Sequence, residues 1–111
     1  MFLFEKLDIY KKALNYCQEI LELLVNDNIN SNLKDQLYRA STSIVLNIAE
    51  GSGRYTQKSK NNFYIYSRGS IYECVAILQI LKNQELIEEK VYYKHYALLE
   101  ELSKMISKLI K

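Results

Sequence analysis

The sequence of 111 residues contains no proline, no tryptophan and only three glycines. Proline and glycine most often mark tight turns, so this chain has few places where it can reverse direction sharply. An all-β fold needs many such turns between short strands and is therefore disfavoured. These absences favour a small number of long helices, and the length fits a single domain.

Cysteine and long apolar runs are also scarce. Cys17 and Cys74 lie far apart in the sequence, and no Cys-x-x-Cys spacing is present, which argues against a zinc site or a redox pair. We expect both to be reduced core residues. No apolar run approaches the ~20 residues that cross a bilayer, and the first residues lack a signal-peptide pattern. We therefore expect a cytoplasmic protein with no membrane partner, no metal and no cofactor.

Groups suited to acid–base catalysis are few. His95 is the single histidine, and it falls on the apolar side of the last predicted helix, where packing at a helix interface is the simpler interpretation. Glu50 and Glu73 could form a carboxylate pair of the kind found in metal-binding bundles. Those sites also use a Glu-x-x-His motif, which this sequence lacks. We therefore predict that the protein is not an enzyme.

The sequence does contain helical periodicity in four segments. Apolar residues recur at spacings of three and four within residues 7–25, 33–48, 56–83 and 88–110. A polar loop rich in asparagine follows the first segment, and Asn30, Ser31 or Asn32 could cap the second helix. Four helices with short connections predict an all-α, antiparallel up-down-up-down four-helix bundle, formed by residues 1–111 as one domain. In the first helix the row predicted to face the core is Leu7, Tyr10, Leu14, Cys17, Leu21 and Leu24, and Ala13 and Ile20 are predicted to widen it on one side.

The third and last helices each have two adjacent apolar rows, which is wider than one packing seam. Such helices need contacts on more than one side. A lone bundle would leave part of this surface exposed, and exposed apolar patches of this extent mark interfaces. We therefore predict a homo-oligomer.

The glycine-containing stretch at residues 47–55, NIAEGSGRY, lies between the second and third helices. It lacks the Gly-x-x-x-x-Gly-Lys-Ser/Thr spacing of a phosphate-binding loop. It also lacks the third glycine of a dinucleotide fingerprint, because Thr56 stands at that place. The simpler interpretation is a helix stop at Gly51 or Gly53, with glycine in the left-handed terminal conformation.

Residues 36–54, QLYRASTSIVLNIAEGSGR, resemble the pattern QLRRAAxSIPxNIAEGxGR of the four-helix-bundle 23S rRNA-intervening-sequence proteins. Residues 4–13 are similar to the opening helix of that family, and residues 69–73 to its Gly-Ser-Leu-x-Glu segment. The resemblance spans nearly the whole chain. It implies a pentamer and a relation to the accessory protein of diversity-generating retroelements, which partners a reverse transcriptase and contacts nucleic acid.

Several polar residues and glycines of these motifs fall on or beside faces that should point inward. Buried polar groups need partners, so we expect hydrogen bonds across the helices, with Arg39, Arg54 or Arg68 neutralising a glutamate. Gly69 would let the helices approach closely. The predicted structural cluster consists of Ser43, Asn47, Glu50, Gly51, Gly69, Ser70 and Glu73.

A basic and aromatic stretch runs from Gly51 to Tyr72 without an acidic residue, although the net charge of the chain is only +2. Its cations could contact phosphates, and exposed aromatic rings could stack on unpaired bases of RNA or DNA. A solvated helix start above a tyrosine-rich core is the alternative, as is docking of a protein partner. The predicted nucleic-acid-binding residues are Arg39, Arg54, Lys58, Lys60 and Arg68.

Overall fold

The computed structural model describes all 111 residues, Met1–Lys111, and contains helices without any strand. The elements are η1 (Leu3–Lys6), α1 (Asp8–Glu19), α2 (Leu21–Leu24), α3 (Ser31–Ser52), α4 (Gln57–Asn83) and α5 (Glu89–Leu109). Ile20 separates α1 from α2 but keeps helical dihedrals, with φ −60° and ψ −28°. The two helices therefore form one rod, and the short η1 before them was not predicted.

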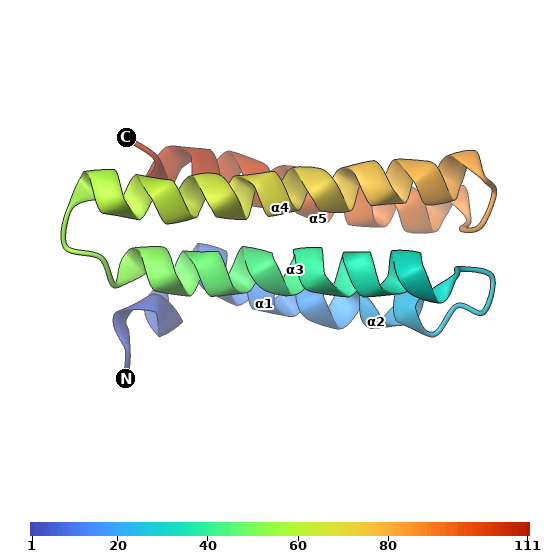
Figure 1. Ribbon diagram of the computed structural model, residues 1–111, viewed down its shortest axis with the longest axis horizontal. Coiled ribbons are helices and arrows are strands. Elements are labelled where there is room, and N and C mark those ends of the chain that lie inside the picture. Colours follow the sequence, from blue (N-terminus) through green and yellow to red (C-terminus); the bar gives the residue numbers. More distant parts are fainter.

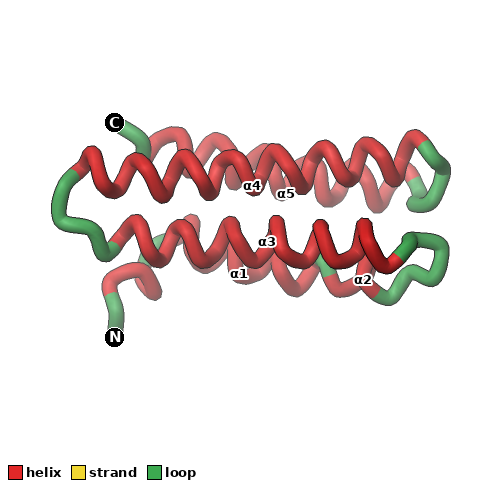
Figure 2. Tube along the Cα trace, in the orientation of Figure 1, coloured by secondary structure: helices red, strands yellow, loops and turns green.

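The four rods form an antiparallel bundle with principal extents of 44 × 25 × 22 Å (Figure 1). In this view α3 and α4 lie side by side, and α1 and α5 lie behind them. The chain reverses at the left end between α3 and α4, and at the right end in the other two connections (Figure 2). Both termini lie at the left end. The predicted all-α up-down-up-down fold is confirmed.

Side-chain caps define where the two central helices begin. The Asn30 side chain accepts a hydrogen bond of 2.8 Å from the backbone N–H of Leu33, so the loop supplies one of the three expected caps of α3. Thr56 accepts from the N–H of Ser59 in the same way at the start of α4. These contacts satisfy backbone donors that would otherwise lack a partner in the first turn.

The stop of α3 lies where the sequence predicts it, but its backbone conformation differs. The helix ends at Ser52, and Gly53 follows with φ −86°. No glycine has a positive φ, so the predicted left-handed termination is wrong. Instead, hydrogen bonds from Gly53 N to Glu50 O and from Arg54 N to Gly51 O continue a helix-like turn into the connection.

The core row of α1 lies on the side where Ala13 and Ile20 were predicted to widen the seam, and the centre of the predicted row is wrong by one residue. Leu14 and Leu21 are each 49% exposed, and other members of the predicted row are only half-buried. A shift of one residue rotates a helix by about 100°, so the predicted row lies on a flank rather than in the core. The residues of α1, Ile20 and α2 that are buried are Ile9, Ala13, Tyr16, Ile20 and Leu23.

The two apolar rows of α5 are largely covered within the single chain, contrary to the argument for self-association. Leu98, Met105 and Leu109 pack partly buried against the core, and Tyr96 is the one member of these two rows among the exposed large hydrophobic residues. On α4 the second row does remain partly exposed, at Tyr66 and Ile80. The apolar surface left over lies mainly on α1, α3 and α4.

Small residues let α3 and α4 pack closely. Ser67 is completely buried and donates a hydrogen bond of 2.9 Å to the carbonyl oxygen of Ile44 on α3. Near the end of α3, a methyl group added to Gly51 would meet the ring of Tyr64 at 2.7 Å. Gly69 has nothing within 4 Å of the corresponding position, so the predicted role of Gly69 in close approach is wrong and belongs to Gly51.

Candidate nucleic-acid interface

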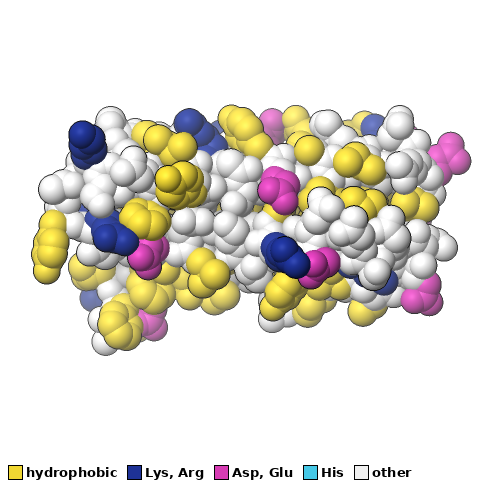
Figure 3. Space-filling model, viewed as in Figure 1, with side chains coloured by type: hydrophobic (Ala, Val, Ile, Leu, Met, Phe, Trp, Pro, Cys, Tyr) yellow, Lys and Arg dark blue, Asp and Glu magenta, His cyan; other side chains and the backbone are white.

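The α3–α4 connection and the first turns of α4 form a basic corner at one end of the bundle. Figure 3 shows dark blue basic side chains at the left end of the α3–α4 face, with yellow hydrophobic side chains beside them. The name "α3–α4 corner" is used below for Arg54, Tyr55, Lys58, Lys60, Phe63 and Tyr66.

Arg54 is held in place from two sides. Its Nη2 atom lies 2.9 Å from Oε1 of Glu50, one helical turn earlier, and its guanidinium carbon lies 4.4 Å from the centre of the Phe63 ring. Cation–π contact and ion pairing both restrict this otherwise flexible side chain. Glu50 is thus neutralised by one of the arginines expected to do so, although on the surface and within one segment rather than across the core.

Lys58 and Lys60 differ in whether their ammonium groups already have a partner within the protein. Lys60 donates a hydrogen bond of 2.9 Å from Nζ to the carbonyl oxygen of Ser52, which ties the start of α4 to the end of α3. Lys58 is exposed and makes no ion pair or side-chain hydrogen bond. Lys58 is therefore the cation of the corner that is most available to an anionic ligand.

The other two predicted basic residues lie apart from the corner. Arg39 pairs with Asp35 on the same helix at 2.7 Å, and its place on α3 is about 20 Å from Arg54 at 1.5 Å of rise per residue. Arg68 lies three turns along α4 from Lys58 and makes no ion pair. The structure thus brings together three of the five predicted binding residues.

Aromatic residues of the stretch divide among three environments. Tyr55 is fully exposed at the connection, and Tyr66 is 62% exposed and packs edge-to-face on Phe63, with 6.2 Å between ring centres. Tyr64 is buried, so it offers no surface for a ligand. Tyr72 lines a different groove, between α4 and α5. Only Tyr55, Phe63 and Tyr66 belong to the corner.

A shallow hollow of about 560 Å³ lies at the corner beside Tyr55. Arg54, Glu50 and Ser59 contribute polar groups to its lining, and the Tyr55 ring contributes an apolar wall. A planar ligand could therefore meet a ring face together with hydrogen-bonding groups of both kinds.

The predicted polar cluster is realised only in part. Ser70 Oγ and Ser43 Oγ lie 2.8 Å apart and connect α4 to α3. Asn47 instead donates to the Ser43 carbonyl and hydroxyl oxygens within its own helix. Glu73 is exposed and has no ion pair, so the expectation that it lies on an inward face is wrong. A side chain on the surface keeps its hydration and needs no internal partner.

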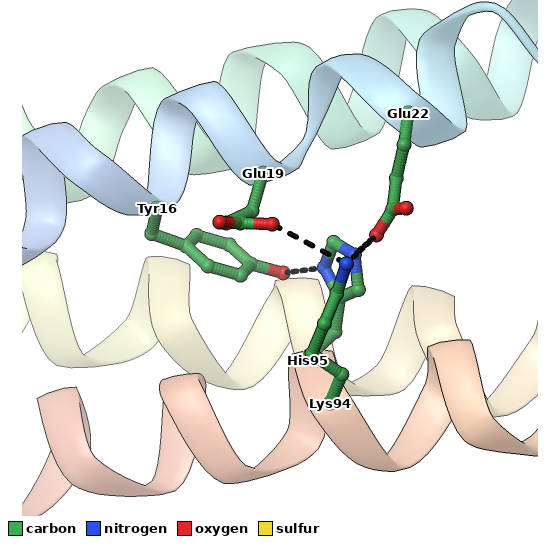
Figure 4. Close-up of polar contacts among 5 residues, drawn as sticks. All are labelled: Tyr16, Glu19, Glu22, Lys94 and His95. Carbon is green, nitrogen blue, oxygen red and sulfur yellow. Dashed lines mark hydrogen bonds and ion pairs between the residues drawn. The ribbon is translucent and has the colours of Figure 1, made fainter.

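The polar network that does cross the bundle was not predicted from the sequence. Figure 4 shows Tyr16, Glu19 and Glu22 pointing from α1 and α2 toward Lys94 and His95 on α5. The Tyr16 hydroxyl lies 3.0 Å from Nδ1 of His95, and Nε2 of His95 lies 2.7 Å from Oε1 of Glu22. Helical spacing alone does not identify it, since the row predicted to face the core in the first helix does not include Tyr16, which the structure buries.

Charge assigns the protons in this network. Partial desolvation raises the pKa of Glu22, but hydrogen bonds from Lys94 at 2.6 Å and from His95 lower it by more. The net effect is a pKa below the usual value for glutamate. Glu22 is therefore a carboxylate, His95 donates to it through Nε2–H, and Nδ1 accepts from the Tyr16 hydroxyl. Burial lowers the pKa of His95, and the contact with Glu22 offsets this only partly, so the ring is neutral.

Burial limits what the network can do chemically. His95 has 0% exposed surface and Tyr16 has 1%, and burial raises the pKa of the Tyr16 phenol. No substrate can reach either group in this conformation. The arrangement joins α1 and α2 to α5, a seam that the Lys12–Glu101 ion pair extends.

No cluster of three or more His, Cys, Asp or Glu side chains is placed to hold a metal ion, and no helix has the length and apolar character needed to span a membrane. A mainly apolar groove of about 360 Å³ lies between α4 and α5. Residues that line it include Ile71, Tyr72, Val75, Tyr96 and Leu99.

Comparisons with known proteins agree on the fold. The family model described as 23S rRNA-intervening sequence protein matches residues 5–108. A crystal structure of a protein with unknown function, of the S23 ribosomal protein family from Bacteroides thetaiotaomicron, superposes with a TM-score of 0.87 at 24% sequence identity. The match covers 93% of this chain and 98% of that one. No curated protein matches the sequence.

Proposed function

The chain belongs to the 23S rRNA-intervening sequence protein family, and from this premise we propose that it is a non-enzymatic, self-associating bundle that binds RNA or DNA through the α3–α4 corner. One observation carries the proposal. Three cations and three partly or fully accessible aromatic rings occur within residues 54–66 at one end of the bundle, in a stretch without any acidic residue, and Arg54 contacts the Phe63 ring. Cations contact phosphates regardless of sequence, and aromatic rings add contacts to bases.

The absence of a catalytic role rests on accessibility. The single histidine is sealed inside the bundle, and Glu50, at the corner, is occupied by Arg54. Catalysis needs a nucleophile or a base within reach of a bound substrate. Neither side chain meets that need in this structure.

Self-association is proposed on an apolar stripe along α1, α2 and α3. Cys17 Sγ lies 3.5 Å from the carbonyl oxygen of Ser41, which sets these antiparallel helices side by side. Leu21, one turn after Cys17, therefore runs level with the turn of α3 that contains Tyr38. Residues of this stripe with exposed side chains are Leu14, Leu21, Val25, Tyr38 and Leu46. The pentamer implied by the family remains a prediction.

Assembly would strengthen weak binding at each corner. A single corner has three cations, and one of them, Arg54, is already paired with Glu50. Its affinity for a nucleic acid is therefore modest. Copies held in a ring present several corners to one strand, and the second contact then forms at high effective concentration. The proposal thus joins the two features of the surface.

The test is binding of a fluorescein-labelled 20-nucleotide RNA, measured by anisotropy at several salt concentrations. We expect affinity to fall as salt rises, and Lys58→Glu to weaken binding at low salt. The matched control is Lys90→Glu, which makes the same charge change at an exposed site at the other end of the bundle. Equal loss in both variants would refute the assigned site.

A protein-docking role is the second candidate, favoured by the apolar groove between α4 and α5. A docking module would ignore RNA and DNA alone at any salt concentration. A reverse transcriptase is the partner class implied by the resemblance described above. Absence of oligonucleotide binding by the intact assembly would favour this candidate.

A further inference from the structure

We propose that the ligand of the α3–α4 corner is single-stranded nucleic acid, with unpaired bases stacked on Tyr55 and on the Phe63–Tyr66 pair. This inference rests on the proposed function and specifies which nucleic acid the corner takes.

The rings of the corner offer free faces rather than core contacts. Tyr55 is fully exposed, so its ring contributes almost nothing to packing. Tyr66 keeps 62% of its surface exposed although its edge contacts Phe63. Single exposed apolar residues are common on proteins, but here Tyr55 lines one hollow with Arg54, and Arg54 contacts the Phe63 ring on which Tyr66 packs, so these side chains can form a stacking platform.

Arg54 adds a planar group to this platform. Its guanidinium covers one face of Phe63 and is fixed by Glu50, so its outer face stays oriented without a ligand. A base that stacks there meets a surface that is already ordered, which reduces the entropy lost on binding. The guanidinium charge also remains close to the phosphate of the same nucleotide.

Duplex nucleic acid cannot use these features. In a duplex the base faces are covered by neighbouring pairs, and only phosphates and groove edges are accessible. Lys58 is the one cation of the corner without an internal partner, so the electrostatic contribution per copy is small. Stacking contributes about 1–3 kcal/mol per base in single-strand complexes, so it decides the preference here.

The experiment compares three fluorescein-labelled DNA probes with the intact wild-type protein: a mixed-sequence 20-nucleotide strand, its duplex, and an abasic strand of the same length. We expect the single strand to bind at least about tenfold more tightly than the other two. Tyr55→Ala and Tyr66→Ala should each weaken single-strand binding roughly 5- to 100-fold, from about 1–3 kcal/mol per stacked base. Neither change should alter abasic-strand binding.

Controls separate stacking from folding. Tyr55→Phe and Tyr66→Phe keep the ring and should retain single-strand affinity. Tyr93→Ala removes an exposed tyrosine elsewhere and should have no effect. If the single strand, the duplex and the abasic strand bind equally, and Tyr55→Ala binds as the wild type does, the stacking inference is overturned. If Lys58→Glu still weakens binding in that case, the proposed function remains in place. If neither these DNA probes nor the 20-nucleotide RNA binds, both are refuted.

Discussion

Replacing Gly51 by alanine tests how closely α3 and α4 pack. The added methyl group would lie 2.7 Å from Cε1 of Tyr64 and 3.0 Å from Cβ of Phe63. Ordinary contacts of this kind are 3.4 Å or longer, so the Tyr64 ring would have to move by about 0.7 Å. That ring is buried, and a buried ring shifts only together with its neighbours.

The expected cost follows from two opposing contributions. Overpacking of a close contact typically destabilises by about 1–3 kcal/mol. Alanine is the better helix former by about 0.5–1 kcal/mol, but Gly51 is next to the last residue of α3, so little of that gain applies. We expect Gly51→Ala to lower the free energy of unfolding by about 1–2 kcal/mol. For a chain of this size, this lowers Tm by about 4–8 °C.

Gly69 provides a matched control of opposite sign. It lies inside α4 with nothing within 4 Å of an added methyl group. Gly69→Ala should therefore raise the free energy of unfolding by about 0.5–1 kcal/mol through helix propensity alone. The assay is urea unfolding followed by circular dichroism, at one fixed protein concentration because assembly would otherwise shift the transition.

A double-mutant cycle identifies the contact. In a Tyr64→Ala background the ring is gone and only the 3.0 Å contact with Cβ of Phe63 remains, so adding Gly51→Ala should cost clearly less than in the wild type. If Gly51→Ala is as stable as the wild type, or if its cost is unchanged without the Tyr64 ring, the close packing inferred between α3 and α4 is wrong.

Three further predictions concern buried groups. Tyr16→Phe leaves Nδ1 of His95 without its donor and should cost about 1–3 kcal/mol in urea unfolding. Because burial holds the pKa of His95 below its usual value, the unfolded chain binds the proton first as pH falls. Stability should therefore decline as pH drops below about 6.5, and His95→Gln should show a smaller decline between pH 7.5 and 5.5. Burial raises the pKa of the Cys74 thiol to about 12, so a thiol reagent at pH 8 should label Cys74 only after unfolding, whereas half-buried Cys17 should react earlier.

Helix number, order and approximate ends could be predicted from the sequence because each depends on local chemistry. Asn30 caps α3 through its own side chain, and the polar loop before it competes with helical hydrogen bonding. Such interactions involve residues only a few positions apart. Neither needs knowledge of what the helix packs against.

Core orientation and close contacts depended on partners that the sequence does not specify. In α1 the true row, which includes Ile9 and Tyr16, and the predicted row, which includes Leu14 and Leu21, are both apolar at helical spacing. The predicted row has more leucine, yet Tyr16 is buried, where Nδ1 of His95 on another helix accepts a hydrogen bond from its hydroxyl. Gly51 and Gly69 could not be distinguished from the sequence for the same reason, since only the position of the Tyr64 ring shows which of them lies at a close contact.

The candidate site was limited in a similar way. Charge pattern alone located the basic stretch, but helical geometry divides it and places Tyr72 in the α4–α5 groove. Arg39, predicted to bind with this stretch, lies about 20 Å from Arg54 along α3. Which cation is free also depends on the fold. Lys60 donates a hydrogen bond to a carbonyl oxygen of the preceding helix, and Lys58 makes no such contact. Sequence inspection treats the two lysines alike.

The surfaces along the bundle differ in polarity, and this difference makes self-association compatible with ligand binding at the α3–α4 corner. Between α1 and α5, ion pairs of Lys94 and Lys12 keep the surface polar, and between α3 and α4 small residues close the seam. Apolar side chains such as Leu21 remain exposed on the stripe formed by α1, α2 and α3, away from Tyr55 at the end of the bundle. Association through the stripe would cover apolar surface and leave the corner of every copy open. Leu21→Glu should then separate the copies in light scattering and weaken binding of a long strand, while affinity for a strand that spans one corner stays unchanged.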